Sequence, residues 1–271
     1  MNMPKAKFRF GELETDEGIP SMDAVAEVVE ANGIFGPPGD QRGVQPRTDS
    51  DEYIVGDDYI FIRFVKEVTE ERKEIDGNEV TIGDSHIARI MRCLLTRNGS
   101  YAFETTSGVY DKDAIDYLIG DDSQEFGIDF ECNPYNRFTR EQMREFYEQS
   151  FRVRGLKLEE IGEVDSEESS VEKNIANYVD RAGENAVRAE FSTGSQDNNL
   201  AAPGIIDGFA RLSEVKYIRM KDSEGQIREA NRNGRYTFSY PADLDLMDQA
   251  ERVRDILSTV TDGMVHEEDE D

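Results

Sequence analysis

The sequence contains no tryptophan and only two histidines and two cysteines in 271 residues. Cys93 and Cys132 lie 39 positions apart and belong to no Cys-x-x-Cys or Cys/His cluster, so they predict neither a zinc site nor a disulfide. The two histidines are His86 and His266. Because the chain has so few histidines and cysteines, catalysis that depends on a His–His or Cys–His pair is nearly excluded. We therefore expect no cofactor and no metal bound by these residue types.

Long apolar runs are also missing. No stretch approaches the roughly 20 apolar residues of a membrane span, and no N-terminal segment resembles a signal peptide. These absences predict a cytoplasmic protein without membrane contact.

Lysine is scarce, whereas carboxylates are abundant. Asp and Glu total 59 against 31 Lys and Arg, which gives a formal charge of −28, and only nine of the cations are Lys. The acids are spread along the whole chain between apolar periodicities, which indicates a folded protein with a carboxylate-rich surface. In molar salt the repulsion between such charges is screened within about 3 Å. The composition therefore favours a protein of an extreme halophile, and the alternative is a mesophilic protein whose acidity serves a partner.

Alternating strand patterns separated by turn signals and short helical stripes predict an α+β fold. The strongest strand pattern runs from 59 to 68, and Asp76-Gly77 follows it as a hairpin signal. Residues 85–97 carry both a helical stripe and, directly after them, the hairpin signal Asn98-Gly99. We favour a strand that ends at Arg97.

Capping residues mark several helices. Ser21 and Gly33 have the residue types of an N-cap and a C-terminal glycine, and Thr139 and Gln142 form a capping box. A helix over 244–260 carries an apolar seam with alternating spacings of four and three. This seam is typical of a core contact or of a homodimer contact.

We expect two lobes, each with antiparallel strands, hairpins and packed helices. The first covers 1–160 and the second 171–262, with a boundary in the polar run before Val171, and 263–271 form a disordered acidic tail. Residues 33–52 are rich in Gly, Pro, Asp and Gln and are predicted to be a mobile surface loop. Their G-x-x-G-x-x-G run lacks the strand-then-helix context and the Lys-Ser/Thr of a phosphate loop.

One window departs from the acidic average. Between 216 and 235, six cations stand beside only three acids, a local charge of +3. Alternation places Tyr217, Arg219 and Lys221 on one strand face. Arginine and tyrosine on an open sheet face can bind single-stranded nucleic acid. The competing interpretation is that the aromatic side chains are core and the cations pair with carboxylates elsewhere. The candidate contact residues are Lys216, Arg219, Lys221, Arg228, Arg232 and Arg235.

The same region offers a catalytic alternative. Glu214-Val-Lys216, with Asp207 upstream and Glu190 on the preceding strand, is similar to the acid…D/E-x-K pattern of metal-dependent nucleases. The resemblance covers about three residues and implies that two carboxylates hold Mg²⁺ while the lysine orients the attacking water. Asp207 lies only seven positions before Glu214 and does not follow a proline, which departs from that pattern.

Asp129 and Glu131 would also share a strand face, but 59 acids produce such pairs by chance. We therefore expect a non-enzymatic binding protein, without a cofactor, whose C-terminal sheet contacts nucleic acid or a protein partner. The alternatives are the Mg²⁺-dependent nuclease and a structural protein that dimerises through 244–260.

Overall fold

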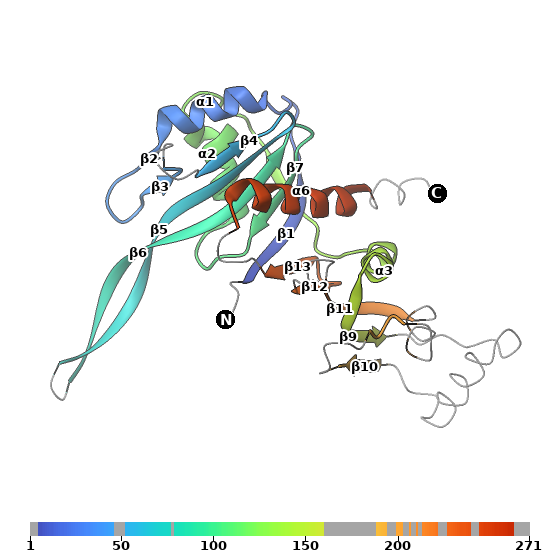
Figure 1. Cartoon of the computed structure of the whole chain (residues 1–271). Coiled ribbons are helices and arrows are strands. Elements are labelled where there is room, and N and C mark those ends of the chain that lie inside the picture. Colours follow the sequence, from blue (N-terminus) through green and yellow to red (C-terminus); the bar gives the residue numbers. More distant parts are fainter. Residues whose placement is uncertain are drawn as a thin grey trace, which may run out of the picture. The chain divides into compact units, whose positions relative to one another are not determined.

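The structure is a computed structural model, shown in Figure 1. It describes residues 5–45, 52–76, 79–159, 188–193, 199–202, 206, 210, 213–221, 227–239 and 244–262. Helices and antiparallel strands alternate along the chain, which confirms the α+β class.

The chain forms two compact units, and each is described by itself. Unit 1 comprises Met1–Lys7, Asn136–Ala242 and Thr259–Asp271, and unit 2 comprises Phe8–Tyr135 and Asp243–Ser258. The lobe boundary expected between 160 and 171 lies outside the described residues, as does the acidic tail 263–271.

Unit 2 is built on an antiparallel sheet with the strand order β1-β7-β6-β5-β3-β2, in which β4 also pairs with β5 and β8 with β1. Two helices, α1 and α2, and a short 3-10 turn, η1, lie between these strands in sequence. The element bounds are β1 Lys5–Glu14, α1 Met22–Asn32, β2 Ile34–Phe35, β3 Arg42–Gly43, β4 Tyr53–Val55, β5 Tyr59–Asp76, β6 Glu79–Thr96, β7 Ser100–Glu104, α2 Asp111–Ile119, η1 Asp121–Ser123 and β8 Glu131–Pro134.

The core of unit 2 lies between this sheet and the two helices. Alternation along β5 turns Ile60, Ile62 and Phe64 to one face, where they form one cluster with apolar side chains of α1 and α2 such as Val25 and Ile115. All five side chains are fully buried. The apolar face of the strand and the apolar faces of the two helices therefore pack against each other in one core.

The predicted Asn98-Gly99 turn and the predicted caps of α1 are confirmed, whereas Gly77 of the predicted Asp76-Gly77 turn lies outside the described residues. Residues 85–96 belong to the strand β6, which ends at Thr96, one residue before the predicted end at Arg97, and the β6–β7 hairpin turns at Gly99 with φ 90°. The Ser21 hydroxyl accepts a hydrogen bond from the Ala24 amide at 3.3 Å, and Gly33 ends α1 with φ 55°. The positive φ at Gly33 and at Gly99 explains why glycine stands at both positions.

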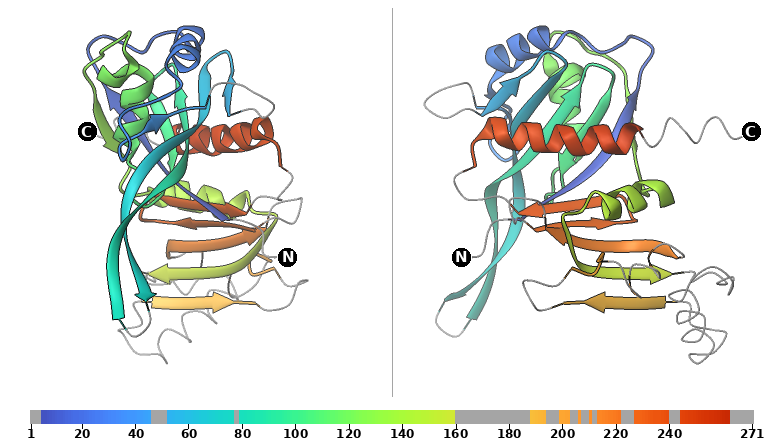
Figure 2. Two further views of the ribbon diagram at one scale, coloured as in Figure 1. Left: turned by 90° about the vertical axis from the view of Figure 1, so that its left-hand side faces the viewer. Right: turned by 45° about the vertical axis from the view of Figure 1, so that its right-hand side comes forward.

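β5 and β6 are much longer than the sequence patterns predicted. Beyond Val68 and Ile87 they continue as a two-stranded ribbon, from the pair Thr69 and His86 to the pair Asp76 and Glu79, eight pairs in all. We call these residues, 69–76 and 79–86, the β5–β6 arm; Figure 2 shows it as the paired strands that extend from the rest of the unit 2 sheet. At about 3.3 Å per residue the arm is roughly 25 Å long. No other described strand pairs with either of its edges.

In its described residues, unit 1 contains the helix α3 beside a second run of antiparallel strands with the order β10-β9-β11-β12-β13. The predicted capping box is present, because the Thr139 hydroxyl accepts from the Gln142 amide and the Gln142 side chain accepts from the Thr139 amide. The bounds are α3 Arg140–Glu148, β9 Arg152–Glu159, β10 Arg188–Ser192, β11 Glu214–Lys221, β12 Ile227–Asn231 and β13 Arg235–Ser239.

The predicted C-terminal helix is α6, Leu246–Asp262. Its seam residues Ala250, Val253, Leu257 and Val260 are at most 2% exposed, so the seam is core, the first of the two roles expected for it. Among the described residues, no helix is long and apolar enough to cross a membrane.

The segment 33–52, expected to be a mobile loop, contains the two short strands β2 and β3. Ile34 pairs with Gly43, and Gly43 in turn pairs with Val65 of β5. Residues 46–51 of this segment lie outside the described residues, and its mobility stays a prediction.

Candidate binding surface on the unit 1 sheet

The strand register divides the side chains of the unit 1 sheet between two faces. Paired residues share a face, and successive residues alternate between faces. One face is apolar and includes Leu156, Ile218 and Tyr236, all buried. We call the other the polar face; it carries Glu190 and Ser192 of β10, Lys157 and Glu159 of β9, Tyr217 and Arg219 of β11, Glu229 and Asn231 of β12, and Arg235 and Thr237 of β13.

Lys216 lies at an irregularity in β11. The register with β9 shifts between Val215 and Tyr217, which makes Lys216 an extra residue in its strand. Its ammonium contacts the Glu214 carboxylate at 2.8 Å and the Glu159 carboxylate at 3.4 Å. The hydrogen bond to Glu214 is the main reason why the pKa of Lys216 is raised. This predicted contact residue is thus engaged by two carboxylates.

Carboxylates also stand beside Arg219 and Lys157 on the polar face. Arg219 Nε lies 3.7 Å from a Glu229 oxygen, and Lys5 of β1 reaches the same oxygen at 3.3 Å. Lys157 contacts Glu190 at 3.3 Å. The competing interpretation, that the cations pair with carboxylates elsewhere in the chain, therefore describes the contacts of Arg219 and Lys216 in part, and their partners lie in the same sheet.

Two of the six predicted cations lie away from the polar face. Arg228 pairs with Met220 and Phe238, so its register places it on the apolar face. Arg232 follows β12 in a turn and is only 8% exposed, and its guanidinium forms an ion pair with Glu214. The structure thus places Lys216, Arg219 and Arg235 along the polar face and Lys221 at the end of β11, and it separates Arg228 and Arg232 from them.

The aromatic side chains are divided as well. Tyr236 and Phe238 are 3% and 4% exposed and belong to the core. Tyr217 stays on the polar face, half-buried, with the Lys157 ammonium 5.8 Å from its ring centre. Burial raises the pKa of Tyr217 to about 12, so its hydroxyl keeps its proton at neutral pH. Among the described residues, Tyr217 is therefore the aromatic side chain that this face offers.

The residues of the nuclease alternative do not form a metal site in the described part of the chain. Glu190 and Glu214 lie on strands that β9 separates, two strand spacings or about 10 Å apart, whereas Mg²⁺ needs ligands at about 2.1 Å. Glu214 is already engaged by Arg232 and Lys216. Asp207 lies outside the described residues. Among those described, no group of three or more His, Cys, Asp or Glu side chains is placed to hold a metal ion.

The two cysteines offer no nucleophile. Both are free, and Cys93 is buried. Burial raises the pKa of the Cys132 thiol to about 12 and that of Cys93 further, so both stay protonated at neutral pH.

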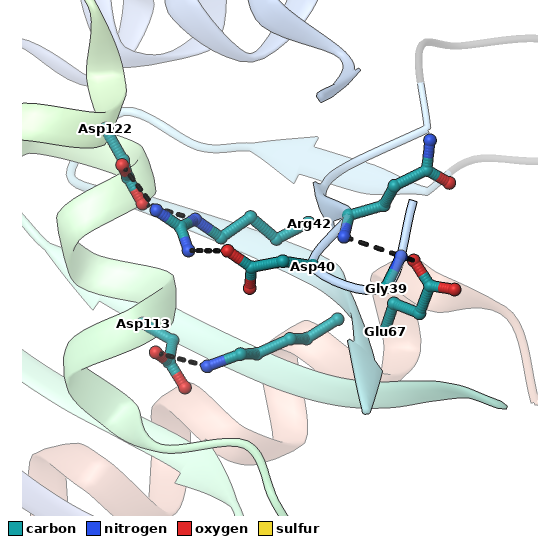
Figure 3. Close-up of polar contacts among 8 residues, drawn as sticks. Gly39, Asp40, Arg42, Glu67, Asp113 and Asp122 are labelled. Carbon is teal, nitrogen blue, oxygen red and sulfur yellow. Dashed lines mark hydrogen bonds and ion pairs between the residues drawn. The ribbon is translucent and has the colours of Figure 1, made fainter. Parts of the chain in front are cut away.

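Unit 2 contains a polar network that the sequence patterns did not predict, shown in Figure 3. A Glu67 oxygen accepts hydrogen bonds from the Gly39 amide at 2.7 Å and the Gln41 amide at 3.3 Å. Arg42 contacts Asp122 of η1 at 2.6 Å, and this hydrogen bond raises the pKa of Arg42. Because Glu67 occupies amides that an anion would need, the glycine-rich turn is fastened to β5 by the chain's own carboxylate.

The amino-acid sequence matches no protein-family model and no curated protein sequence.

Proposed function

We propose that this chain is a salt-adapted, non-enzymatic, cytoplasmic binding protein that contacts a protein partner through the polar face of the unit 1 sheet. The observation that carries this proposal is the interleaving of charges on that face. Lys157 with Glu190, and Arg219 with Glu229, form ion pairs across neighbouring strands.

This pattern favours a protein over a polynucleotide. Affinity for a phosphate backbone comes from cations that release counterions, and it falls steeply with salt concentration. On the polar face the contacts of Lys157, Lys216 and Arg219 with carboxylates offset that attraction. A protein surface with its own alternating charges can match such a pattern, which gives specificity more than raw affinity.

Tyr217 is the residue we expect near the centre of the contact. It lies on β11 between Lys157 of β9 and Asn231 of β12. Tyrosine is enriched among the residues that dominate interface energies, because a rigid ring with a polar tip buries much area.

A photo-crosslinking amino acid in place of Tyr217 tests this proposal. Light should yield a discrete product of higher mass in cells, and protease but not nuclease should destroy the added mass. The same probe at Tyr110, an aromatic residue of unit 2 that is 67% exposed, serves as the matched control. A nuclease-sensitive product would show that the partner is a nucleic acid and not a protein. Equal products from both positions would refute the proposal that the polar face is a specific contact surface.

A charge exchange separates recognition from folding. Arg219→Glu together with Glu229→Arg keeps an ion pair between β11 and β12 but reverses its direction. We expect the unfolding midpoint to change little and the Tyr217 product to be lost. An unchanged yield of that product would show that the charge pattern does not select the partner.

A further inference from the structure

A small pocket lies beside the C-terminal end of α3 in unit 1. Its volume is about 90 Å³. Phe146, Met220 and Tyr236 contribute to its lining and are between 3% and 5% exposed, so they form an apolar floor. The Ser150 hydroxyl, also in the lining, donates to the Phe146 carbonyl oxygen at 2.5 Å and contacts Met220 Sδ at 2.9 Å. The floor is therefore held in place by α3 and β11 together.

An exposed aromatic side chain stands at the rim. Phe151 lines the pocket and is 59% exposed, one of few large apolar side chains so exposed among the described residues. The Arg152 guanidinium lies 5.5 Å from its ring centre. The exposed ring and the apolar floor together offer apolar surface to a ligand.

Two cationic side chains, Lys221 and Arg228, line the same pocket. In the strand register, Lys221 of β11 lies opposite Arg152 of the neighbouring strand β9. No carboxylate is among the described lining residues, in a chain whose formal charge is −28. The two charged side chains among the described lining residues are thus both cations, and cations favour an anionic ligand.

We propose that this pocket docks a short acidic segment of a partner protein. One apolar side chain of that segment fills the pocket, and carboxylates next to it contact Lys221 and Arg228 by charge-assisted hydrogen bonds. The small volume favours one anchoring side chain over a whole helix face. Met220, Arg228 and Tyr236 belong to the α3 side of the sheet, away from Tyr217, whereas Lys221 follows the alternation of Tyr217 and Arg219 at the end of β11. The floor of the site therefore lies on the side opposite the polar face, and the site can fail or succeed separately.

Fluorescence anisotropy on the full chain in molar KCl tests the proposal. The probe is a labelled Glu-Glu-Leu-Glu-Glu peptide, compared with one in which serine replaces leucine and one in which lysine replaces every glutamate. Only the first should bind. Phe151→Ala, and Lys221→Glu combined with Arg228→Glu, should each weaken binding at least tenfold.

Two matched controls should bind as the natural chain does. Tyr110→Ala removes an exposed ring from unit 2, and Arg144→Glu reverses a charge on α3 outside the pocket. Circular dichroism melts establish that each variant folds; if Phe151→Ala does not, the charge variant decides.

Equal binding of the leucine and serine peptides would overturn the proposal, as would variants that match their controls. Displacement of the peptide by benzoate or by oligo(dT) at lower concentration would also overturn it, in favour of a small acid or of a nucleic acid. Phe151→Ala should leave the Tyr217 cross-link unchanged, which keeps the two proposals distinguishable.

Discussion

The ion pair between Arg232 and Glu214 gives the sharpest prediction about unit 1. Their side chains are 10% and 11% exposed. Breaking a buried pair by removing one partner typically destabilises a protein by about 3–5 kcal/mol. After Arg232→Met, however, the Glu214 carboxylate keeps its contact with Lys216 at 2.8 Å. We therefore expect a loss at or just below the lower end of that range, about 2–3 kcal/mol.

The double variant Arg232→Met with Glu214→Met should recover most of this loss, because no buried charge is then left without a partner. Lys216 would still contact Glu159 at 3.4 Å. Urea unfolding in molar KCl measures the free energies, since urea adds no ions. The control is Arg219→Met, whose partner contact is 3.7 Å and whose side chain is 47% exposed, so its loss should stay below about 1 kcal/mol.

The reasoning is refuted if Arg232→Met and Arg219→Met destabilise the chain equally. It is also refuted if the double variant loses as much as the sum of the two single ones, because independent losses mean that the two groups do not interact.

Three further predictions concern pH, the arm and salt. The raised pKa of Lys216 means that its ion pairs stabilise the fold fully below its ordinary pKa of 10.5 and are lost as pH rises through the folded value. The difference in urea midpoint between the natural chain and Lys216→Met should therefore be constant at neutral pH and shrink above that range; a pH-independent difference argues against the ion pairs. Joining Val68 to Ile87 by Asn-Gly removes the β5–β6 arm yet preserves a ladder pair, and it should change stability by less than about 1 kcal/mol, because Thr69–Lys73 are exposed. A larger loss in thermal unfolding would mean that the arm belongs to the core. Finally, the melting temperature should rise between roughly 0.5 and 3 M KCl as carboxylate repulsion is screened, and a flat curve would contradict salt adaptation.

Short sequence motifs predicted turns and helix starts correctly where a particular residue type determines the local backbone conformation. Asn98-Gly99 identified the β6–β7 turn, and Ser21 and Thr139 identified two helix starts. The sequence patterns did not predict the β5–β6 arm, because both of its faces are exposed from Thr69 to Lys73. Such a ribbon lacks the alternation of apolar and polar residues that marks a half-buried strand.

The candidate surface was predicted only in part, because its charges are compensated from other strands. The window 216–235 showed six cations, but the sequence did not show that Lys216 contacts Glu159 of β9, or that Arg219 faces Glu229 across the β11–β12 pair. Cross-strand partners depend on sheet order, which one sequence does not reveal. The irregularity at Lys216 likewise shifts the face on which simple alternation would place it.

The most direct test of a non-enzymatic protein contact is a gel with labelled single-stranded DNA, duplex DNA and RNA in molar KCl, with and without Mg²⁺. The interleaved carboxylates of the polar face predict neither a shift nor cleavage. A shift that weakens on Arg219→Ala and Arg235→Ala would contradict a protein partner. Metal-dependent cleavage that Glu214→Ala abolishes would show instead that the chain is an enzyme.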